Sequence, residues 1–326
     1  MNLLITGASG KVGRSLLRKL EEGSLPERCS VRILAHRRVP KSSEGVEVVQ
    51  GDVSSKEDVQ RAMDGVTHLI HLATCKESPD RIMDVSVKGL FWLLEECRMS
   101  PTFQRVVLIG GDSSTGHFFY PHPIPMTETQ GRTPYPGCYP LSKVLEEVML
   151  EQYYIQYDLD GCCLRAPWIM EKDDFRMALS FGRDVFGVPR WCDLVEPEQA
   201  RRYCREGIIP VMTDPDGNAV RRNIVHVEDV ADAILTALKH PAARQQLFNI
   251  TMDEPVSYRE VADYLNSTRG IQSVEVSTPY YSNWMDNSKA KFRLGWKPEF
   301  DFRRLVDSAW DYRRAGDDPR EVIYPG

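Results

Sequence analysis

A tyrosine and a lysine four residues apart, Tyr139 and Lys143, are the side chains of this sequence best suited to acid–base chemistry. At this spacing on a helix they lie on one face. A phenol alone is a poor acid or base at neutral pH, but a neighbouring ammonium group favours its phenolate. Such a pair can exchange a proton with an alcohol or a carbonyl. The alternative, for the pair alone, is an ordinary tyrosine and lysine on a helix surface.

Three glycines near the N-terminus, Gly7, Gly10 and Gly13, could bind a phosphate group. They follow a short apolar segment, residues 1–5, and lead into an amphipathic segment that begins at Val12. Strand, glycine turn and helix form the context of a dinucleotide-binding loop, because glycines let the backbone approach a pyrophosphate and the helix start offers N–H groups. The spacing is G-x-x-G-x-x-G instead of the commoner G-x-G-x-x-G. A tight surface turn is the alternative, but the position after a strand favours nucleotide binding.

The elements that must position these residues alternate along the first half of the chain. Segments typical of buried strands cover residues 1–5, 31–35, 46–52, 67–73, 105–111 and 161–165. Helical patterns between them cover residues 57–63, 82–97 and 141–157. This alternation predicts an α/β fold, a doubly wound parallel sheet of the Rossmann type. Ligands of such sheets bind beyond the carboxyl ends of the strands.

The rest of the chain predicts a smaller C-terminal lobe that is interleaved with the sheet. Prolines and aromatic residues fill residues 118–140, which predicts a pocket-lining loop or a rigid connector. Alternation stops near Pro167, and we expect residues 168–217 to be irregular. The expected division is an NAD(P)-binding domain of residues 1–166 and 223–250, and a substrate-binding lobe of residues 167–222 and 251–326.

Composition is that of a globular protein and argues against some classes of partner. The 326 residues include 41 Lys and Arg against 47 Asp and Glu, a net charge of −6, which argues against nucleic acid or an anionic membrane as the main partner. No apolar run approaches the length of a membrane span, and the N-terminal residues do not resemble a signal peptide. The eight cysteines contain no C-x-x-C pair, so we expect reduced thiols and a cytoplasmic protein. We expect no metal site.

The end of the second expected strand bears on the choice of cofactor. An acidic residue there binds the ribose 2′-hydroxyl of NAD, and a basic residue accommodates the 2′-phosphate of NADP. This chain has His36, Arg37 and Arg38 at that point. We therefore expect NADP, with NAD as the alternative, and Arg37 as the phosphate ligand. Solvated loop charges remain the other explanation of the arginines.

Taken together, these motifs resemble the extended short-chain dehydrogenase/reductase superfamily, in its NAD-dependent epimerase/dehydratase branch. The resemblance rests on residues 6–13, 51–53, 71–74, 165–167, 222–231, 287–290 and 294–298, and on the Y-x-x-x-K pair. It implies that the cofactor is bound by Gly7, Ser9, Gly10, Lys11, Val12, Gly13, Arg37, Asp52, Val53, Leu72, Ala73, Thr74, Tyr139, Lys143 and Pro167.

The resemblance also implies a mechanism. Tyr139 would be the general acid/base, Lys143 would bind the nicotinamide ribose and favour the Tyr139 phenolate, and hydride would pass between a substrate carbon and the nicotinamide. Substrates of this branch are mostly sugars, often linked to a nucleotide, and many members form homodimers through two long helices. The expected substrate-binding residues are Asp112, Ser113, Trp168 and Arg222. Arg222 matches a residue that contacts the diphosphate in nucleotide-sugar members, and a structural ion pair is its alternative.

The chain departs from the family pattern at the end of the fifth strand. The family sequence S-S-x-x-V-Y-G carries a catalytic Ser or Thr as its second residue, and alignment on Gly116 puts Gly111 at that position. Because glycine has no hydroxyl, Ser113 is the expected catalytic substitute. Asp112 fits the Asp of the Asp-Glu pair found in dehydratases, but Ser113 replaces the Glu, which argues against dehydration.

These observations favour an NAD(P)-dependent oxidoreductase that acts on an alcohol or carbonyl of a sugar or sugar derivative. An NAD-dependent sugar or nucleotide-sugar epimerase is the alternative enzyme. An alternative of another class is a non-catalytic NADP(H)-binding regulator, which the glycine at position 111 favours and the intact Tyr139 and Lys143 pair opposes.

Overall fold

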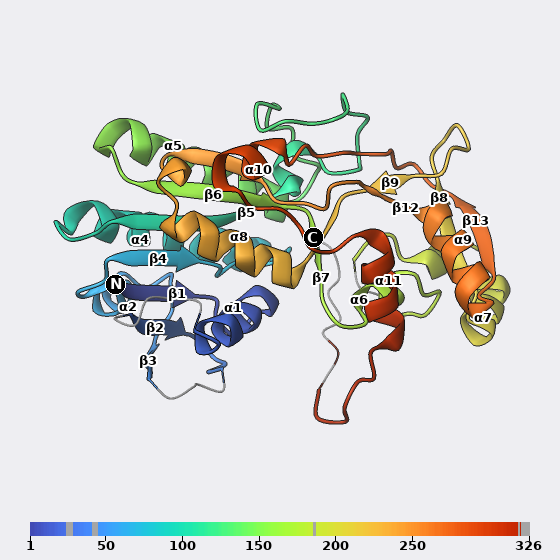
Figure 1. Ribbon diagram of the computed structural model, residues 1–326, viewed down its shortest axis with the longest axis horizontal. Coiled ribbons are helices and arrows are strands. Elements are labelled where there is room, and N and C mark those ends of the chain that lie inside the picture. Colours follow the sequence, from blue (N-terminus) through green and yellow to red (C-terminus); the bar gives the residue numbers. More distant parts are fainter. Residues whose placement is uncertain (24–28, 41–44, 185–186, 319, 321–326) are drawn as a thin grey trace.

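A seven-stranded parallel sheet forms the larger part of the molecule (Figure 1). The computed structural model describes residues 1–23, 29–40, 45–184, 187–318 and 320. Across the sheet the strands are β11 (Gln246–Asn249), β6 (Gly161–Ala166), β5 (Arg105–Gly111), β4 (His68–His71), β1 (Asn2–Thr6), β2 (Ser30–Ala35) and β3 (Val46–Gln50), all paired in parallel. The chain adds strands outward from β1 on one side and then from β4 on the other, which is the doubly wound arrangement. The predicted fold class is confirmed.

Helices cover both faces of this sheet. One face packs against α1 (Lys11–Glu21), α8 (Val227–Lys239) and α10 (Ser288–Leu294), and the other against α2 (Lys56–Met63), α4 (Gly89–Met99) and α5 (Cys138–Tyr157). Successive side chains of a strand point to opposite faces. Leu3 and Ile5 therefore join the first core, and Leu4 joins the second. Burial on both faces explains why the strands read as continuous apolar runs.

The segment before α4 is helical but not uniform. The chain forms α3 (Pro79–Ile82), a π-helical stretch η1 (Met83–Lys88) and then α4. The sequence pattern over residues 82–97 predicts helix, which is confirmed, but it carries no sign of the π-helical turn.

A third core, that of the smaller lobe, lies beside the sheet. Its strand pairs are β8 (Ile209–Thr213) with β13 (Ser273–Ser277), β7 (Trp168–Met170) with β10 (Ile224–His226), and β9 (Arg221–Arg222) with β12 (Val256–Ser257). Its helices are α6 (Asp174–Ala178), α7 (Pro197–Glu206), α9 (Tyr258–Arg269) and α11 (Phe302–Asp311), with the short turn η3 (Trp191–Asp193). In Figure 1, α7, α9, β8 and β13 lie together at the right-hand end. The expectation that residues 168–217 are irregular is wrong, because β7, α6, η3, α7 and β8 fall within them.

The chain returns to the larger sheet near its end. Ala290, Leu294 and Trp296 pack in the core that contains α1 and α8, and Trp296 Nε1 donates a hydrogen bond to the Asp229 carbonyl at 3.0 Å. The range 251–326 is expected from the sequence to belong to the smaller lobe. Its described residues contribute both to the core of that lobe and to the core that contains α1 and α8.

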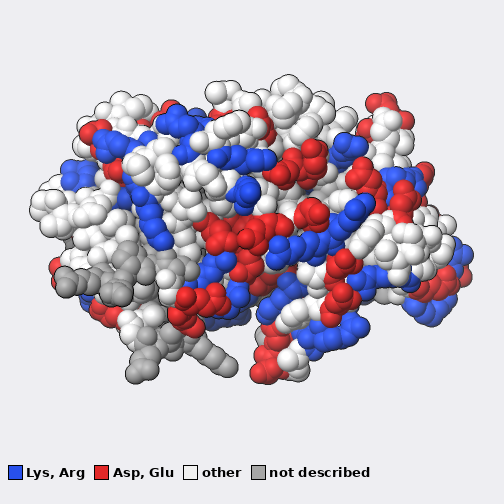
Figure 2. All heavy atoms as spheres, viewed as in Figure 1, with Lys and Arg blue, Asp and Glu red and all other residues white. Residues whose placement is uncertain are grey.

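Charge is mixed over the surface. On the face drawn in Figure 2, acidic and basic side chains of the described residues are intermingled. Within the described ranges, no helix combines the length and the apolar character needed to cross a membrane.

Candidate active site

The loop between β1 and α1 needs glycine at two positions for lack of space. Gly7 has φ +70°, and a Cβ atom there would lie 2.6 Å from the Ala73 nitrogen. A Cβ atom on Gly13 would lie 2.5 Å from the Cα atom of Ala8. Gly10 is the N-cap of α1, and no side chain bonds to the first turn from that position. The loop thus packs tightly against the end of β4 and leaves a helix N-terminus for an anion, which fits the pyrophosphate of a dinucleotide.

Two adjoining cavities extend from this loop along the carboxyl ends of the strands. One, of ≈450 Å³, reaches past Tyr139 to Trp168, and the other, of ≈400 Å³, reaches Arg37. Both include Gly7, Gly10, Leu72 and Thr74, so the glycine loop lies at their junction. This arrangement suits a dinucleotide whose pyrophosphate lies in the middle and whose two ends lie in the two cavities.

The structure brings all of the expected site residues to these cavities. The larger one is lined by Gly7, Gly10, Lys11, Val12, Gly13, Leu72, Thr74, Asp112, Ser113, Tyr139, Lys143, Pro167, Trp168 and Arg222. The other is lined by Gly7, Ser9, Gly10, Arg37, Asp52, Val53, Leu72, Ala73 and Thr74.

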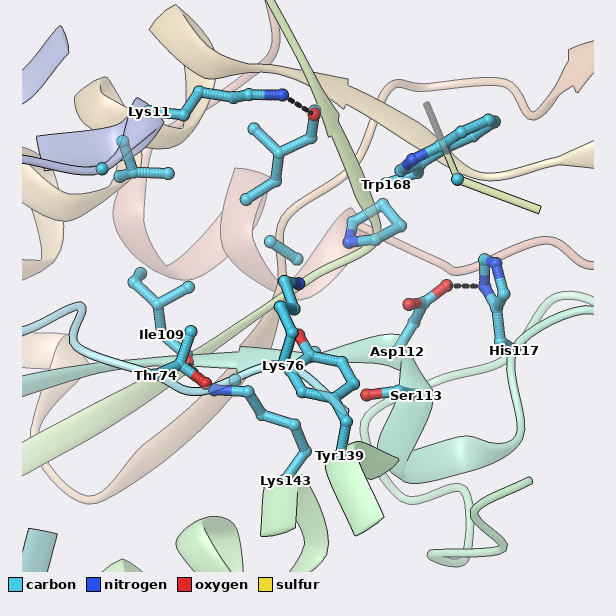
Figure 3. A pocket seen from close by; sticks show the side chains of 18 of the residues that line it. Lys11, Thr74, Lys76, Ile109, Asp112, Ser113, His117, Tyr139, Lys143 and Trp168 are labelled. Carbon is cyan, nitrogen blue, oxygen red and sulfur yellow. Dashed lines mark hydrogen bonds and ion pairs between the residues drawn. The ribbon is translucent and has the colours of Figure 1, made fainter. Parts of the chain in front are cut away.

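Tyr139 lies in the first turn of α5, which begins at Cys138, as the proline at position 140 predicts. Its side chain points from the start of the helix into the larger cavity (Figure 3). The Lys143 ammonium lies 5.8 Å from the centre of the Tyr139 ring and donates hydrogen bonds to Glu146 at 2.7 Å and to the Ile109 carbonyl at 3.3 Å. Burial lowers the pKa of Lys143, but the charge and hydrogen bond of Glu146, together with the nearby Tyr139 and Cys163, raise the pKa overall. Lys143 therefore remains a cation beside the phenol.

Two neighbours of Tyr139 are not indicated by the motifs. Lys76 places its ammonium 4.3 Å from the centre of the Tyr139 ring and lines the same cavity. Glu77 accepts hydrogen bonds from the backbone nitrogens of Cys138 at 2.5 Å and Tyr139 at 3.1 Å, and so caps α5. Partial burial raises the pKa of Glu77, but hydrogen bonds from the Cys138 side chain and from these N–H groups hold the pKa below its ordinary value. The only sequence signal for this pair is its place just beyond the segment 71–74, with Cys75 between.

A short 3₁₀ turn, η2 (Asp112–Thr115), follows β5 and carries the hydroxyl expected to replace the family serine. Ser113 Oγ is buried, has no hydrogen-bond partner among the described residues, and lines the cavity with Tyr139 (Figure 3). A Cβ atom on Gly111 would lie 3.2 Å from this oxygen. The Ser113 hydroxyl therefore lies beside the space that the missing side chain of Gly111 leaves. Ser114 Oγ differs, because it lies 2.9 Å from both the Gly111 carbonyl oxygen and a Glu147 carboxylate oxygen, which share its single proton.

The charged groups of Lys11 and Arg222, two residues expected to bind the cofactor and the substrate, form hydrogen bonds within the protein. Lys11 donates to the Ile169 carbonyl at 3.0 Å and pairs with Asp174, so it links the glycine loop to the smaller lobe (Figure 3). Arg222 donates to the Val188 carbonyl at 2.7 Å and, through its other terminal nitrogen, to a histidine of the cavity wall.

The smaller cavity has a basic rim and one carboxylate. Arg37 and Arg38 line it after the end of β2, and Asp52 lines it after β3. Asp52 accepts a hydrogen bond from the Ser54 nitrogen at 2.9 Å and lies 3.2 Å from His36 Nε2. Burial raises the pKa of Asp52, but these partners lower it overall, so the carboxylate is ionised at neutral pH.

Comparisons with known proteins agree with this geometry. The model of the NAD dependent epimerase/dehydratase family matches residues 3–170. The UDP-glucose 4-epimerase of Azospirillum brasilense is 26% identical over 96% of this chain and 92% of its own length. A short-chain dehydrogenase/reductase superfamily protein from Agrobacterium tumefaciens with bound NAD has a TM-score of 0.77 at 21% identity, covering 95% of this chain and 96% of that one. The UDP-glucose 4-epimerase of Thermotoga maritima with UDP-glucose has a TM-score of 0.73 at 20% identity, covering 96% and 98%.

Proposed function

We propose, from the premise that this chain belongs to the NAD-dependent epimerase/dehydratase family, that it is an NADP(H)-preferring oxidoreductase acting on an alcohol or carbonyl group of a sugar or sugar derivative. The family match confirms the resemblance inferred from the motifs, and with it an enzyme of the extended short-chain dehydrogenase type that uses a nicotinamide cofactor. The reaction, the substrate and the preference for NADP are the proposal.

One observation carries the proposal: Tyr139, Lys143 and Ser113 line the same cavity as the glycine loop. When bound, the nicotinamide cofactor would supply or accept the hydride. The Tyr139 phenol would give a proton to, or take one from, the substrate oxygen, while the buried Lys143 cation favours the phenolate. The Ser113 hydroxyl, which has no described partner, would donate a hydrogen bond to the same oxygen.

The proposed preference for NADP rests on the rim of the smaller cavity. The segment that follows β2 presents Arg37 and Arg38 there, and the carboxylate of Asp52 is engaged with Ser54 and His36. A guanidinium group suits a 2′-phosphate because it can donate two parallel hydrogen bonds to it. We assign this contact to Arg37.

The proposed function is tested by turnover of a panel of sugars with NADP and NAD. We expect Tyr139→Phe to abolish turnover while leaving cofactor binding, measured by NADPH fluorescence, within about threefold of the wild type. Tyr157→Phe, an exposed tyrosine at the far end of the same helix, is the matched control and should retain activity. Unchanged turnover in Tyr139→Phe would remove the redox assignment, and a protein that binds cofactor but turns over no sugar would be the non-catalytic regulator.

A sugar epimerase is the second candidate, and the match to the Azospirillum enzyme along nearly the whole chain favours it. An epimerase interconverts two sugars without net consumption of cofactor. Inversion of a sugar centre seen by NMR, with constant NADPH absorbance, would identify it.

We also propose a cytoplasmic homodimer. All eight cysteines are unpaired, which suits a reducing compartment. Phe91 of α4 and Leu141, Ile155 and Tyr157 of α5 are exposed apolar side chains on the two helices proposed to pair, and exposed apolar side chains suit an interface. The solution mass, measured by light scattering, tests the dimer, and Ile155→Glu should shift it to the monomer.

A further inference from the structure

The end of the larger cavity that lies beyond Tyr139 contains a chain of three side chains, Asp112, His117 and Arg222. All three line the cavity and are buried. His117 Nδ1 contacts the Asp112 carboxylate, and His117 Nε2 lies 2.8 Å from an Arg222 terminal nitrogen. These hydrogen bonds connect Asp112 of η2 to His117, which lies just after η2. They connect His117 in turn to Arg222 of β9, about a hundred positions later in the sequence.

The direction of each hydrogen bond follows from the chemistry of arginine, which can only donate. His117 Nε2 must therefore accept from Arg222 and carry no proton. The proton of the neutral ring is then on Nδ1, which donates to Asp112. Burial holds the pKa of His117 below its ordinary value, consistent with the neutral ring. One oxygen of Asp112 is thus occupied, and Figure 3 shows the other turned away from His117 into the cavity.

The guanidinium group of Arg222, in contrast, is buried, and both of its terminal nitrogens already donate hydrogen bonds within the protein. Its two terminal nitrogens donate to the Val188 carbonyl at 2.7 Å and to His117. Its planar group lies 3.6 Å from the centre of the Trp168 ring and 4.2 Å from that of Phe118. Only 2% of the residue is exposed, and its Nε atom, which has no hydrogen-bond partner among the described residues, is buried away from solvent. A phosphate would have to break these contacts to reach the guanidinium, and it would meet the Asp112 carboxylate in the same space.

Resting on the oxidoreductase function proposed above, we infer that the site takes an uncharged polyhydroxylated substrate, a free sugar or sugar derivative without phosphate or nucleotide. In this inference Asp112 accepts a hydrogen bond from one substrate hydroxyl, and Ser113 contacts the reacting oxygen. The cavity of ≈450 Å³ holds both the substrate and the nicotinamide end of the cofactor, which suits a single sugar ring. Trp168 and Tyr135 line the same end and offer apolar surface to the C–H groups of such a ring.

The test compares free hexoses with UDP and UDP-glucose on the protein loaded with NADP. Binding is measured by calorimetry and saturation-transfer NMR, and turnover by NADPH formation. We expect at least one free hexose to bind and to be turned over, and UDP and UDP-glucose to bind more weakly than about 1 mM. Asp112→Asn should raise the KM for that hexose on the order of 10- to 100-fold, the loss expected for a hydrogen bond to a charged acceptor. The change in kcat should be smaller, and the Kd of NADPH should not change.

Asp216→Asn is the matched control, since it removes one negative charge from an exposed turn remote from the cavity. Tight binding of UDP or UDP-glucose would overturn the inference, as would an unchanged KM in Asp112→Asn. If no compound is turned over, the proposed function fails, and binding alone decides the substrate class. Hexose binding that Asp112→Asn abolishes would then support the inference, and binding of UDP, or of neither class, would overturn it.

Discussion

Removal of the Ser113 hydroxyl is the sharpest test of the proposed chemistry. Ser113 Oγ is buried in the cavity wall without a described partner. If it donates to the substrate oxygen, Ser113→Ala should lower kcat by ~10²–10³-fold, or ~2.7–4 kcal/mol of transition-state stabilisation. The same change should not destabilise the fold, because a buried hydroxyl without a partner does not favour folding. The assay is steady-state turnover with the best substrate of the panel, together with urea unfolding.

Ser114 provides the matched control one residue away. Its hydroxyl shares its proton between the Gly111 carbonyl and Glu147 and does not line the cavity. Ser114→Ala should therefore cost about 1–3 kcal/mol of stability while the folded enzyme keeps its kcat. The two alanine variants should thus show opposite patterns, activity lost in one and stability lost in the other.

The glycine at position 111 allows a rescue experiment. Its φ of −148° and ψ of 149° suit any residue. In the wild type a Cβ atom there would lie 3.2 Å from Ser113 Oγ, which is tight, but Ser113→Ala removes that oxygen. We expect Gly111→Ser combined with Ser113→Ala to recover at least about tenfold in kcat over Ser113→Ala alone, since roughly 1.4 kcal/mol of restored stabilisation suffices. If Ser113→Ala retains kcat within about threefold of the wild type, the hydroxyl has no catalytic role and the reasoning fails.

Three further predictions concern the cofactor, the helix cap and pH. Arg37→Ala should raise the Kd of NADPH by about tenfold or more and leave that of NADH unchanged, because only NADPH carries the 2′-phosphate; equal weakening in fluorescence titrations would exclude the contact. Glu77→Ala should cost about 1 kcal/mol of stability in urea unfolding and also lower kcat, because it uncaps the helix turn that holds Tyr139; a loss of stability with unchanged kcat would limit Glu77 to a structural role. Burial, with the Lys143 charge, lowers the pKa of His71 to about 3, so the unfolded chain takes up a proton near its ordinary pKa while the folded chain does not. His71 should therefore reduce stability as the pH falls from about 6.5 toward 4, by up to about 1.4 kcal/mol per pH unit, and His71→Asn should weaken this dependence in urea midpoints. Parallel pH profiles for variant and wild type would contradict that assignment.

Local signals account for what the sequence predicted well. Glycines are needed at positions 7 and 13 because a Cβ atom would collide with the segment after β4 or with the loop itself. The sequence shows this requirement as the regular spacing of the glycines. The inner parallel strands are buried on both faces, so most of them appear as apolar runs, and the order of strands and helices then follows from the winding rule. Tyr139 at the start of α5 follows from the proline beside it.

The elements and site residues that the sequence did not predict depend on contacts between distant segments. β7 and β10 are three-residue strands that pair with each other across more than fifty residues. Neither segment has a sequence pattern that predicts this pairing. α7 begins with Pro197, and half of its ten residues are charged, so its apolar face is narrow and does not stand out in the sequence. Lys76 and Glu77 meet Tyr139 only through the packing of the loop after β4 against α5.

The departure of this chain from its family at position 111 is best understood as one change of loop geometry. The η2 turn places the Ser113 hydroxyl beside the space of the missing side chain, and it also carries Asp112, whose carboxylate His117 holds from just beyond the turn. A hydroxyl supplied from position 111 would leave little room for this turn, because its Cβ atom would already lie 3.2 Å from Ser113 Oγ. Glycine at 111 therefore leaves room for the serine at 113, and the same turn carries Asp112 of the Asp112–His117–Arg222 chain. In the proposed function, the donor to the reacting oxygen, Ser113, and the acceptor for a second substrate hydroxyl, Asp112, would then come from adjacent residues of one turn.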